Sequence, residues 1–168
     1  MVDLNKTREH AEEQFWEQVG DVRAGMLGLQ GVADHMQPMS PREEPGAKIL
    51  WFYLSADSDL YRHVKDGNAK AHFCVVGKDH DYHACAMGTL SETTDQAKID
   101  EHWDPIVAAW FEGGKDDPKM RMLGMRLDNA AVWGSTDSSA RFGWEIAKSN
   151  LVDEKVPDVG VRTDVQFG

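Results

Sequence analysis

Two strand-like runs joined by a short polar turn constrain the fold of this chain more than any other feature. The runs are Ala69–Val76 and Tyr82–Thr93, and residues 77–81 between them read Gly-Lys-Asp-His-Asp. Strand-like runs that flank so short a turn predict a β-hairpin. The structure is therefore expected to be built around an antiparallel sheet.

The two cysteines of the chain, Cys74 and Cys85, lie on opposite sides of this turn. If Asp79 and His80 form the centre of the turn, the cysteines lie opposite each other across the hairpin. A disulfide is then geometrically conceivable. Two cysteines with apolar neighbours in a cytoplasmic chain are more often reduced packing residues, and this interpretation is favoured.

Shorter runs predict the elements around the hairpin. A first helix capped by Asn5 or Thr7 is expected to extend to about Val19, with further helices at residues 59–65 and 138–150. Additional strands are expected at residues 24–30, 32–39, 48–54, 122–127 and 130–135. Residues 152–168 are expected to form a polar C-terminal tail.

These elements fit one domain that spans residues 1–168. Six or seven strands, mostly joined by short turns in a chain of 168 residues, suggest a barrel. The hydrophobic content of 41% is ordinary for a globular protein with a single core. The expected class is mainly β with flanking helices (α+β).

The segment at residues 99–118 joins two tryptophans to a glycine-containing acidic turn. Ile99, Trp103, Ile106 and Trp110 follow helical spacing and are expected on one stripe. Pro105 lacks a backbone donor, so two short helices are expected to meet at residue 104, and the second ends at residues 113–114. Packing of the tryptophans on the core is the simpler interpretation, and a wall of a binding site is the alternative.

Charge and hydropathy exclude several classes of partner. The net charge is −11 and acidic residues are spread along the chain, which disfavours nucleic acid and anionic membranes as main partners. No apolar run is long enough to cross a bilayer, and the N-terminal segment lacks the apolar stretch of a secretion signal. A cytoplasmic location is expected.

The sequence contains no recognisable protein-only catalytic group. His80 and His83 lie at the predicted turn, and nothing elsewhere completes a set of metal ligands with familiar spacing, so no metal site is predicted. Gly113-Gly114-Lys115 lacks the earlier glycine of a phosphate loop and is followed by Asp116 instead of Ser or Thr. A nucleoside triphosphate site is therefore not expected.

The chain resembles the general stress protein family of the pyridoxamine 5′-phosphate oxidase-like, FMN-binding split barrels. The resemblance covers residues 7–150. Its carriers are Gln37-Pro38-Met39, Leu50-Trp51-Phe52-Tyr53, Ser55-Ala56-Asp57-Ser58, residues 99–118 and Val132-Trp133. The resemblance implies a six-stranded antiparallel split β-barrel that forms a homodimer and holds one FMN in each of two clefts between the subunits.

The resemblance also implies which residues bind the cofactor. The flavin ring would be faced by Gln37, Pro38, Met39, Trp51, Phe52, Tyr53 and Leu54. Ser55 and Ser58 would lie near the phosphate, and Trp110 and Trp133 would close the cleft, with a contribution from the other subunit. Aromatic walls suit a flat conjugated ring.

Two positions depart from the family pattern. Gln37 stands where arginine is common, and Leu60 stands where a lysine is expected. Both cations would neutralise the phosphate, and each charge-assisted bond is worth about 1.5–3 kcal/mol, so the expected affinity for FMN is lowered. Arg62 or His35 could compensate.

Two functions of different classes follow. The first is a dimeric FMN-binding protein with flavin-dependent oxidoreductase activity, in which the cofactor carries the electrons. The alternative is a non-enzymatic split-barrel module that has lost FMN and either binds another flat ligand or acts in a stress response. Pyridoxamine phosphate oxidation itself is not expected, because it needs a second cationic site.

Overall fold

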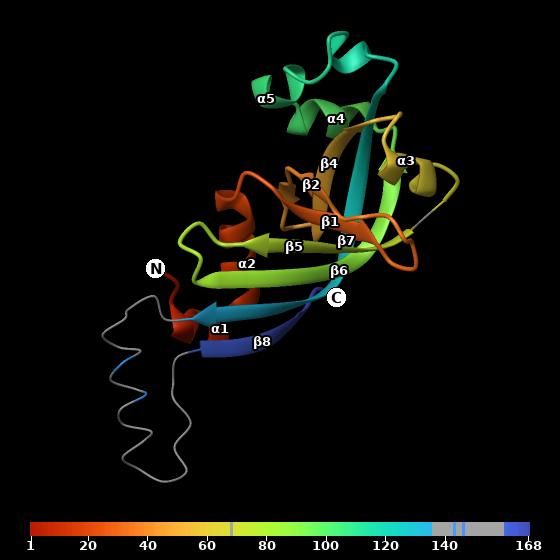
Figure 1. Ribbon diagram of the computed structural model, residues 1–168. Coiled ribbons are helices and arrows are strands. Elements are labelled where there is room, and N and C mark those ends of the chain that lie inside the picture. The colour runs from red at the N-terminus through yellow and green to blue at the C-terminus, as the bar shows by residue number, and fades with distance from the viewer. Residues whose placement is uncertain (68, 136–142, 144–145, 147–159) are drawn as a thin grey trace.

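The computed structural model describes residues 1–67, 69–135, 143, 146 and 160–168, and shows a strongly bent antiparallel sheet with helices at its two ends (Figure 1). The strand order is β2-β1-β5-β6-β7-β4-β3, and β8 pairs with a different part of β7 from the part that pairs with β4. The strands are β1 (Gly25–Leu29), β2 (Gln37–Met39), β3 (Arg42–Glu44), β4 (Ile49–Ser55), β5 (Ala69–Val76), β6 (Tyr82–Thr93), β7 (Met120–Ser135) and β8 (Gly160–Gln166). The predicted split-barrel architecture is confirmed, but the described residues form eight strands instead of six.

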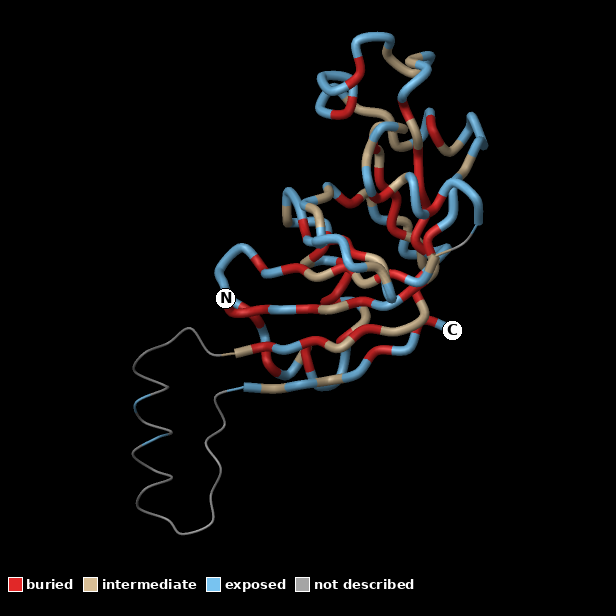
Figure 2. Tube along the Cα trace, turned by 45° about the vertical axis from the view of Figure 1, so that its right-hand side comes forward, coloured by how far each residue is buried: buried red, intermediate tan, exposed pale blue. Residues whose placement is uncertain are grey.

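The central hairpin has the bounds that the sequence predicts. β5 and β6 pair in one register from Ala69↔Leu90 to Val76↔His83, and this register places Cys74 opposite Cys85. Buried and exposed residues alternate along both strands, as expected where one face packs on a core (Figure 2). The predicted hairpin of β1 and β2 also forms, although β2 contains only three residues.

β7 is one strand of sixteen residues, so the prediction of two separate strands is wrong. Asp128, which lies between the two predicted strands, is the extra residue of a bulge. The register with β6 shifts between Met87 and Gly88, so Asp128 has no partner on β6 there. The first half of β7 pairs with β4 and the second half pairs with β8. This exchange of partners along one long strand splits the sheet.

The C-terminal residues are part of the sheet. Residues 160–166 form β8, and both Val165 and Phe167 are buried. The ring of Phe167 lies 5.3 Å from that of Phe15 and 5.6 Å from that of Trp16. The prediction of a polar tail over residues 152–168 therefore fails at its end, because two apolar side chains among many polar ones suffice to anchor an edge strand. The helix expected at residues 138–150 lies almost wholly outside the described residues.

Two helices cover the end of the sheet formed by β7 and β8. They are α1 (Leu4–Glu9) and α2 (Ala11–Asp21), which bury Phe15 and Val19 completely. The cap of the first helix is Asp3, whose carboxylate accepts hydrogen bonds from two backbone amides. The expected single helix with a cap at Asn5 or Thr7 is thus replaced by two helices that meet at His10.

The opposite end of the sheet carries α3 (Asp59–Val64), α4 (Gln96–His102), α5 (Pro105–Ala108) and the short 3-10 helix η1 (Gly114–Asp116) (Figure 1). Asp95 caps α4 and Asp104 caps α5, so the predicted break before Pro105 is confirmed. β3 pairs with β4, although the sequence analysis expects no strand at these residues. Among the described residues, no helix is long and apolar enough to cross a membrane.

Candidate functional site

A pocket of about 290 Å³ lies where the ends of β2 and β4 meet α5 and the residues that follow it. Its lining residues are Pro38, Met39, Ser40, Arg42, Tyr53, Leu54, Ser55, Ile106, Val107, Trp110 and Phe111. Most of these side chains are apolar or aromatic, and a few polar groups lie among them. This combination is typical of a site for a small organic ligand.

β4, which ends at the pocket, is covered by other side chains on both of its faces. Leu50, Phe52 and Leu54 belong to the main core, whereas Trp51 belongs to a second cluster beneath α4 and α5. A strand buried on both faces needs a nearly continuous apolar run, and residues 49–54 supply one. The last residues of this strand, 53–55, lie at the pocket.

Tyr53 is held in place at the pocket wall. Its hydroxyl donates a hydrogen bond of 2.8 Å to the carbonyl oxygen of Ile99, and its ring lies edge-on to Trp103 at 5.7 Å. Burial raises the pKa of Tyr53 to about 12. The hydroxyl therefore stays protonated at neutral pH and ties β4 to α4.

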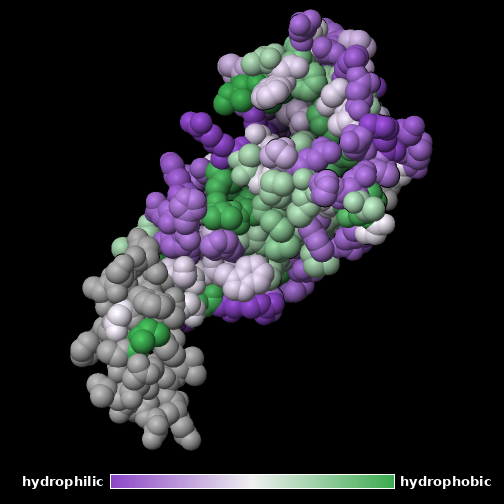
Figure 3. Space-filling view, in the orientation of Figure 1, coloured by the Kyte–Doolittle hydropathy of each residue, from purple (hydrophilic) through white to green (hydrophobic). Residues whose placement is uncertain are grey.

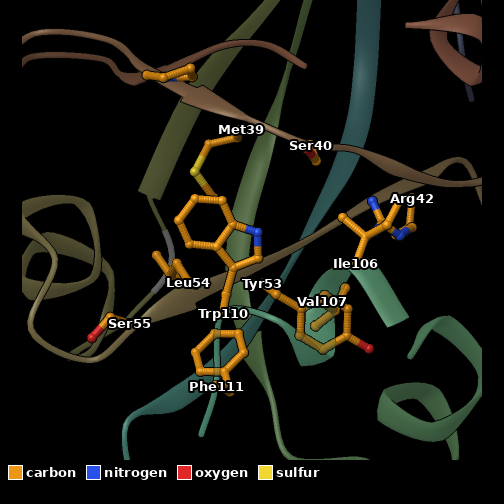
Figure 4. Close-up of a pocket in the computed structure, with 11 residues that line it drawn as sticks. Met39, Ser40, Arg42, Tyr53, Leu54, Ser55, Ile106, Val107, Trp110 and Phe111 are labelled. Atoms are coloured by element: carbon orange, nitrogen blue, oxygen red, sulfur yellow. The ribbon is translucent and has the colours of Figure 1, made fainter. Parts of the chain in front are cut away.

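Trp110 is the most exposed aromatic side chain in the pocket. Its indole lies between Met39 and Phe111, with Ser55 toward one side and Arg42 toward the other (Figure 4). The residue is 81% exposed, although its neighbour Phe111 is buried. A large apolar ring left in water at a pocket is an available surface for a flat ligand.

The predicted helical stripe is correct only in its first half. Ile99 is buried and Trp103 packs beside it, but Ile106 is 67% exposed and the buried residues of the second half are Val107 and Phe111. The break at Pro105 starts a new helix and rotates the following residues relative to α4. The spacing of four that links Ile99, Trp103, Val107 and Phe111 would have identified the buried side, and it leaves Trp110 available for another role.

Arg42 connects β3 to the start of α5. Its guanidinium lies 2.7 Å from the carboxylate of Asp104, which also accepts a hydrogen bond of 2.7 Å from the backbone amide of Val107. Burial opposes ionisation of Asp104, but the amide hydrogen bonds and Arg42 outweigh it, so the pKa of Asp104 is lowered. The Nε atom of Arg42 is buried and has no hydrogen-bond partner.

The Arg42–Asp104 contact gives a prediction about acid stability. The lowered pKa of Asp104 means that its contribution is present above the ordinary value of 3.8 and is lost as the pH falls through the folded-state value. Asp104→Asn keeps a capping side chain but removes the charge, and we expect it to lower the free energy of unfolding at pH 6 by up to about 1 kcal/mol.

Urea unfolding of the wild type and Asp104→Asn between about pH 6 and pH 2.5 tests this prediction. The gap between the two proteins should close toward the acid end, because the carboxyl is then protonated in both states of the wild type. A gap of constant size over this range would show that the charge of Asp104 does not contribute.

Six of the twelve residues expected at the cofactor lie at the pocket. They are Pro38, Met39, Tyr53, Leu54, Ser55 and Trp110. The sequence analysis missed Ser40, Arg42, Val107 and Phe111, and it named Ile106 only as part of the helical stripe. The short β3 lies between two prolines and has no strand pattern that would have indicated Arg42. The spacing of four that starts at Ile99 and Trp103 would have indicated Val107 and Phe111.

Gln37 and Leu60 do not line this pocket. Together they line a separate cavity of about 10 Å³, which His35 and His63 also border. Leu60 is only 5% exposed and packs in the main core. Arg62, the suggested substitute for a missing cation, is ion-paired with Asp59 on the same helix.

Trp51 and Phe52 are packing residues in this structure. The indole nitrogen of Trp51 donates a hydrogen bond of 2.7 Å to Glu44, whose other carboxylate oxygen lies 2.6 Å from the ammonium of Lys98. The ring of Phe52 lies 5.1 Å from that of Phe73 in the main core. Neither residue lines the pocket.

Ser58 and Trp133 also lie outside the pocket lining. Ser58 caps α3, where its hydroxyl accepts a hydrogen bond of 3.2 Å from the amide of Tyr61. Trp133 is 40% exposed near the end of β7, with the guanidinium of Arg162 at 5.8 Å from its ring centre. Among the described residues, no group of three or more His, Cys, Asp and Glu side chains is placed to hold a metal ion.

Comparisons with known proteins agree with this architecture. The sequence profile of the pyridoxamine 5′-phosphate oxidase-like family matches residues 10–158. A structure from Jannaschia sp. CCS1, named as general stress protein 26, shares 34% identity over 94% of this chain and 99% of that chain, with a TM-score of 0.78. The general stress FMN/FAD binding protein from Xanthomonas citri shares 37% identity over 77% of this chain and 92% of that chain, with a TM-score of 0.70.

No curated protein sequence matches the chain significantly. The profile match covers most of the chain, and two structural relatives exceed 30% identity over most of their own lengths. The chain therefore belongs to the general stress protein family of the pyridoxamine 5′-phosphate oxidase-like split barrels.

Proposed function

We propose that this protein binds FMN in the pocket between β2, β4 and α5, that it does so as a homodimer, and that it is a flavin-dependent oxidoreductase. One observation carries the proposal. Met39, Tyr53 and Trp110, which lie far apart in the sequence, converge on one cavity with mostly apolar walls. The related Xanthomonas citri protein is named for binding FMN or FAD, which supports the same class of ligand here.

The walls of the pocket fit the ring of a flavin. The indole of Trp110 offers a flat face, and Met39, Leu54 and Phe111 surround it with apolar surface (Figure 4). A conjugated ring that stacks on an aromatic side chain gains dispersion energy and loses contact with water. Bound there, the flavin would supply hydride or single-electron transfer, and the chain would supply its position and surroundings.

The charged end of FMN needs polar partners, and the pocket offers three. Ser40, Arg42 and Ser55 line it, and Arg42 is the only cation among its described lining residues. We assign Ser55 to the phosphate end, as the family resemblance implies. Arg42 is held by Asp104, so it offers a positioned guanidinium instead of a freely moving charge.

The homodimer is supported by the apolar side chains that a single chain leaves exposed at the pocket. The cavity of about 290 Å³ is at the lower limit of ligand pockets in general. Trp110 and Ile106 are 81% and 67% exposed at its rim. A second subunit that covers these side chains would enlarge the enclosed volume and exclude water from the bound ring.

The second candidate function is a non-enzymatic split-barrel module that binds another flat ligand, or that acts in a stress response without FMN. The observation that favours it is the position of Leu60, which is buried in the core and replaces a cation expected at the phosphate. Such a module would prefer a ligand without a phosphate, because Arg42 already has a carboxylate partner.

Parallel titrations with FMN and riboflavin separate the two candidates. If the pocket binds the phosphate, FMN should bind roughly tenfold to a hundredfold more tightly than riboflavin, because a charge-assisted hydrogen bond is worth about 1.5–3 kcal/mol. Quenching of flavin fluorescence gives the affinity and the number of sites. Sedimentation with and without FMN gives the oligomeric state.

Saturation at one FMN per subunit in a dimer, followed by reduction of the bound flavin with NADH or NADPH, would support the leading proposal. Equal affinities for FMN and riboflavin would favour the module that has lost the phosphate site. No binding of either flavin at micromolar concentration would contradict the flavin proposal.

A further inference from the structure

Cys74 and Cys85 are direct partners across the β5–β6 hairpin. Their Sγ atoms lie 3.2 Å apart, with Cys74 as the donor of a weak hydrogen bond to Cys85. Both thiols are free and half-buried. At this separation the two sulfur atoms are in contact, and only a small decrease in the distance between them is needed to form a covalent bond.

The backbone already suits such a bond. Directly opposed residues in antiparallel strands have Cα atoms about 4.5–5.5 Å apart, and disulfides span about 4.4–6.8 Å between Cα atoms. The register of β5 and β6 continues without a shift on both sides of the cysteine pair, from Ala69↔Leu90 to Val76↔His83. Closing the bond therefore requires no change in strand pairing.

The pair lies on the outer face of the sheet. The residues beside the cysteines along each strand, such as Phe73 and Ala84, are buried in the core, and alternation along a strand directs the cysteines to the other face. Met26, the partner of Cys74 on β1, is 42% exposed. Apolar side chains gather on this side over β1 and β5 (Figure 3). Both cysteines are partly exposed, so we expect a small oxidant to reach them from this face.

We propose that Cys74 and Cys85 form a reversible two-electron redox site, which a peroxide converts into a cross-strand disulfide within one chain. The proposal rests on the geometry of the hairpin and does not depend on flavin binding. It assigns a chemical role to a pair for which packing in the reduced state is the favoured interpretation from sequence.

The roles of the two sulfurs follow from their hydrogen bond. Burial, together with the hydrogen bond to Cys85, raises the pKa of Cys74 to about 12, so Cys74 keeps its proton and donates it toward its partner. We therefore assign the attack on the peroxide to Cys85, because a thiol reacts in its ionised form and Cys74 holds its proton. Cys74 is the thiol that resolves the product.

Two steps balance the reaction. In the first, the Cys85 thiolate bonds to one peroxide oxygen while the O–O bond breaks, giving a sulfenic acid and a hydroxide that takes up a proton to become water. In the second, the Cys74 sulfur bonds to the Cys85 sulfur while the S–O bond breaks, and the leaving hydroxyl takes the Cys74 proton to form water. The two sulfurs lose two electrons and the peroxide gains them.

The experiment treats the reduced full-length protein with hydrogen peroxide and measures intact mass and remaining thiols after denaturation. We expect both thiols to disappear together, the mass of the chain to fall by two hydrogen atoms, and digestion to yield one peptide pair linked through Cys74 and Cys85. A dithiol reductant should restore both thiols. This measurement uses the wild-type protein, so its result does not depend on the folding of a variant.

Single variants test the assigned roles. In Cys74→Ser, the sulfenic acid on Cys85 should persist and react with dimedone, whereas Cys85→Ser should give much less dimedone adduct. Met26→Leu removes the neighbouring sulfur and should leave disulfide formation unchanged. Equal labelling of the two cysteine variants would overturn the assigned order of reaction.

Three results would overturn the redox site itself. Both thiols could survive peroxide that oxidises the exposed methionines, which would show that this face is closed to oxidants. The cysteines could advance to sulfinic acid without becoming linked. The disulfide could join two chains, which reducing and non-reducing gels would reveal.

Discussion

Replacement of Trp110 with alanine should weaken FMN binding by roughly tenfold to a hundredfold, because stacking of a flat heteroaromatic ring on an aromatic side chain is worth about 1–3 kcal/mol. The free energy of unfolding without ligand should hardly change. Trp110 is 81% exposed, so the folded chain gains little from its indole. A fluorescence titration with FMN measures the first quantity and urea unfolding measures the second.

Trp133→Ala is the matched control for this experiment. Trp133 is also partly exposed, at 40%, but it lies near the end of β7 beside Arg162 and does not line the pocket. If one chain forms the site alone, this variant should bind FMN as the wild type does. A loss in both variants would indicate that Trp133 reaches the cleft of a second subunit, and unchanged binding in Trp110→Ala would contradict the proposed stacking.

Phe52→Ala should have the largest effect on stability, with a loss of about 3–5 kcal/mol in the free energy of unfolding. Phe52 is fully buried, and its ring lies 5.1 Å from that of Phe73. Removal of this ring leaves a cavity between β4 and β5 that the surrounding strands cannot fill. Urea unfolding gives the loss, with Phe52→Leu as a control that retains most of the volume and should cost less than about 1.5 kcal/mol.

The same pair of variants tests the position of Phe52 relative to the ligand. The family resemblance predicts that Phe52 faces the flavin, whereas the structure places it in the main core, outside the pocket lining. At a temperature where Phe52→Leu remains folded, its affinity for FMN should therefore match that of the wild type. A strong loss of affinity with little loss of stability would contradict the packing role and restore the prediction from the resemblance.

Local sequence patterns were sufficient for the elements whose interactions lie within a short stretch of chain. The β5–β6 hairpin was predicted with its observed bounds, because its two strands and its turn are contiguous. The break at Asp104 was also predicted, since Pro105 removes a backbone donor wherever the helix packs. Both features depend on neighbours within a few residues.

Patterns failed where a distant partner decided the structure. β8 forms because residues 160–166 pair with a free edge of β7. β3 forms because residues 42–44 pair with a free edge of β4. Neither short strand carries enough apolar residues to be recognised by itself. β7 continues through residues 128 and 129 because a bulge against β6 accommodates the extra residue.

Some features of the pocket could likewise be predicted from sequence, and others could not. The amino-acid pattern was enough to predict the buried run of β4, the glycine-containing segment after α5 and the opposed cysteines, because these depend on periodicity and on contiguous pairing. In contrast, the pattern could not show that Tyr53 and Trp110 line one cavity, or that Phe52 and Leu60 lie outside it, because these positions depend on how the whole chain packs. The reason is that the face on which a side chain lies, and what covers that face, are fixed by strand register and helix rotation among segments that are distant in the chain.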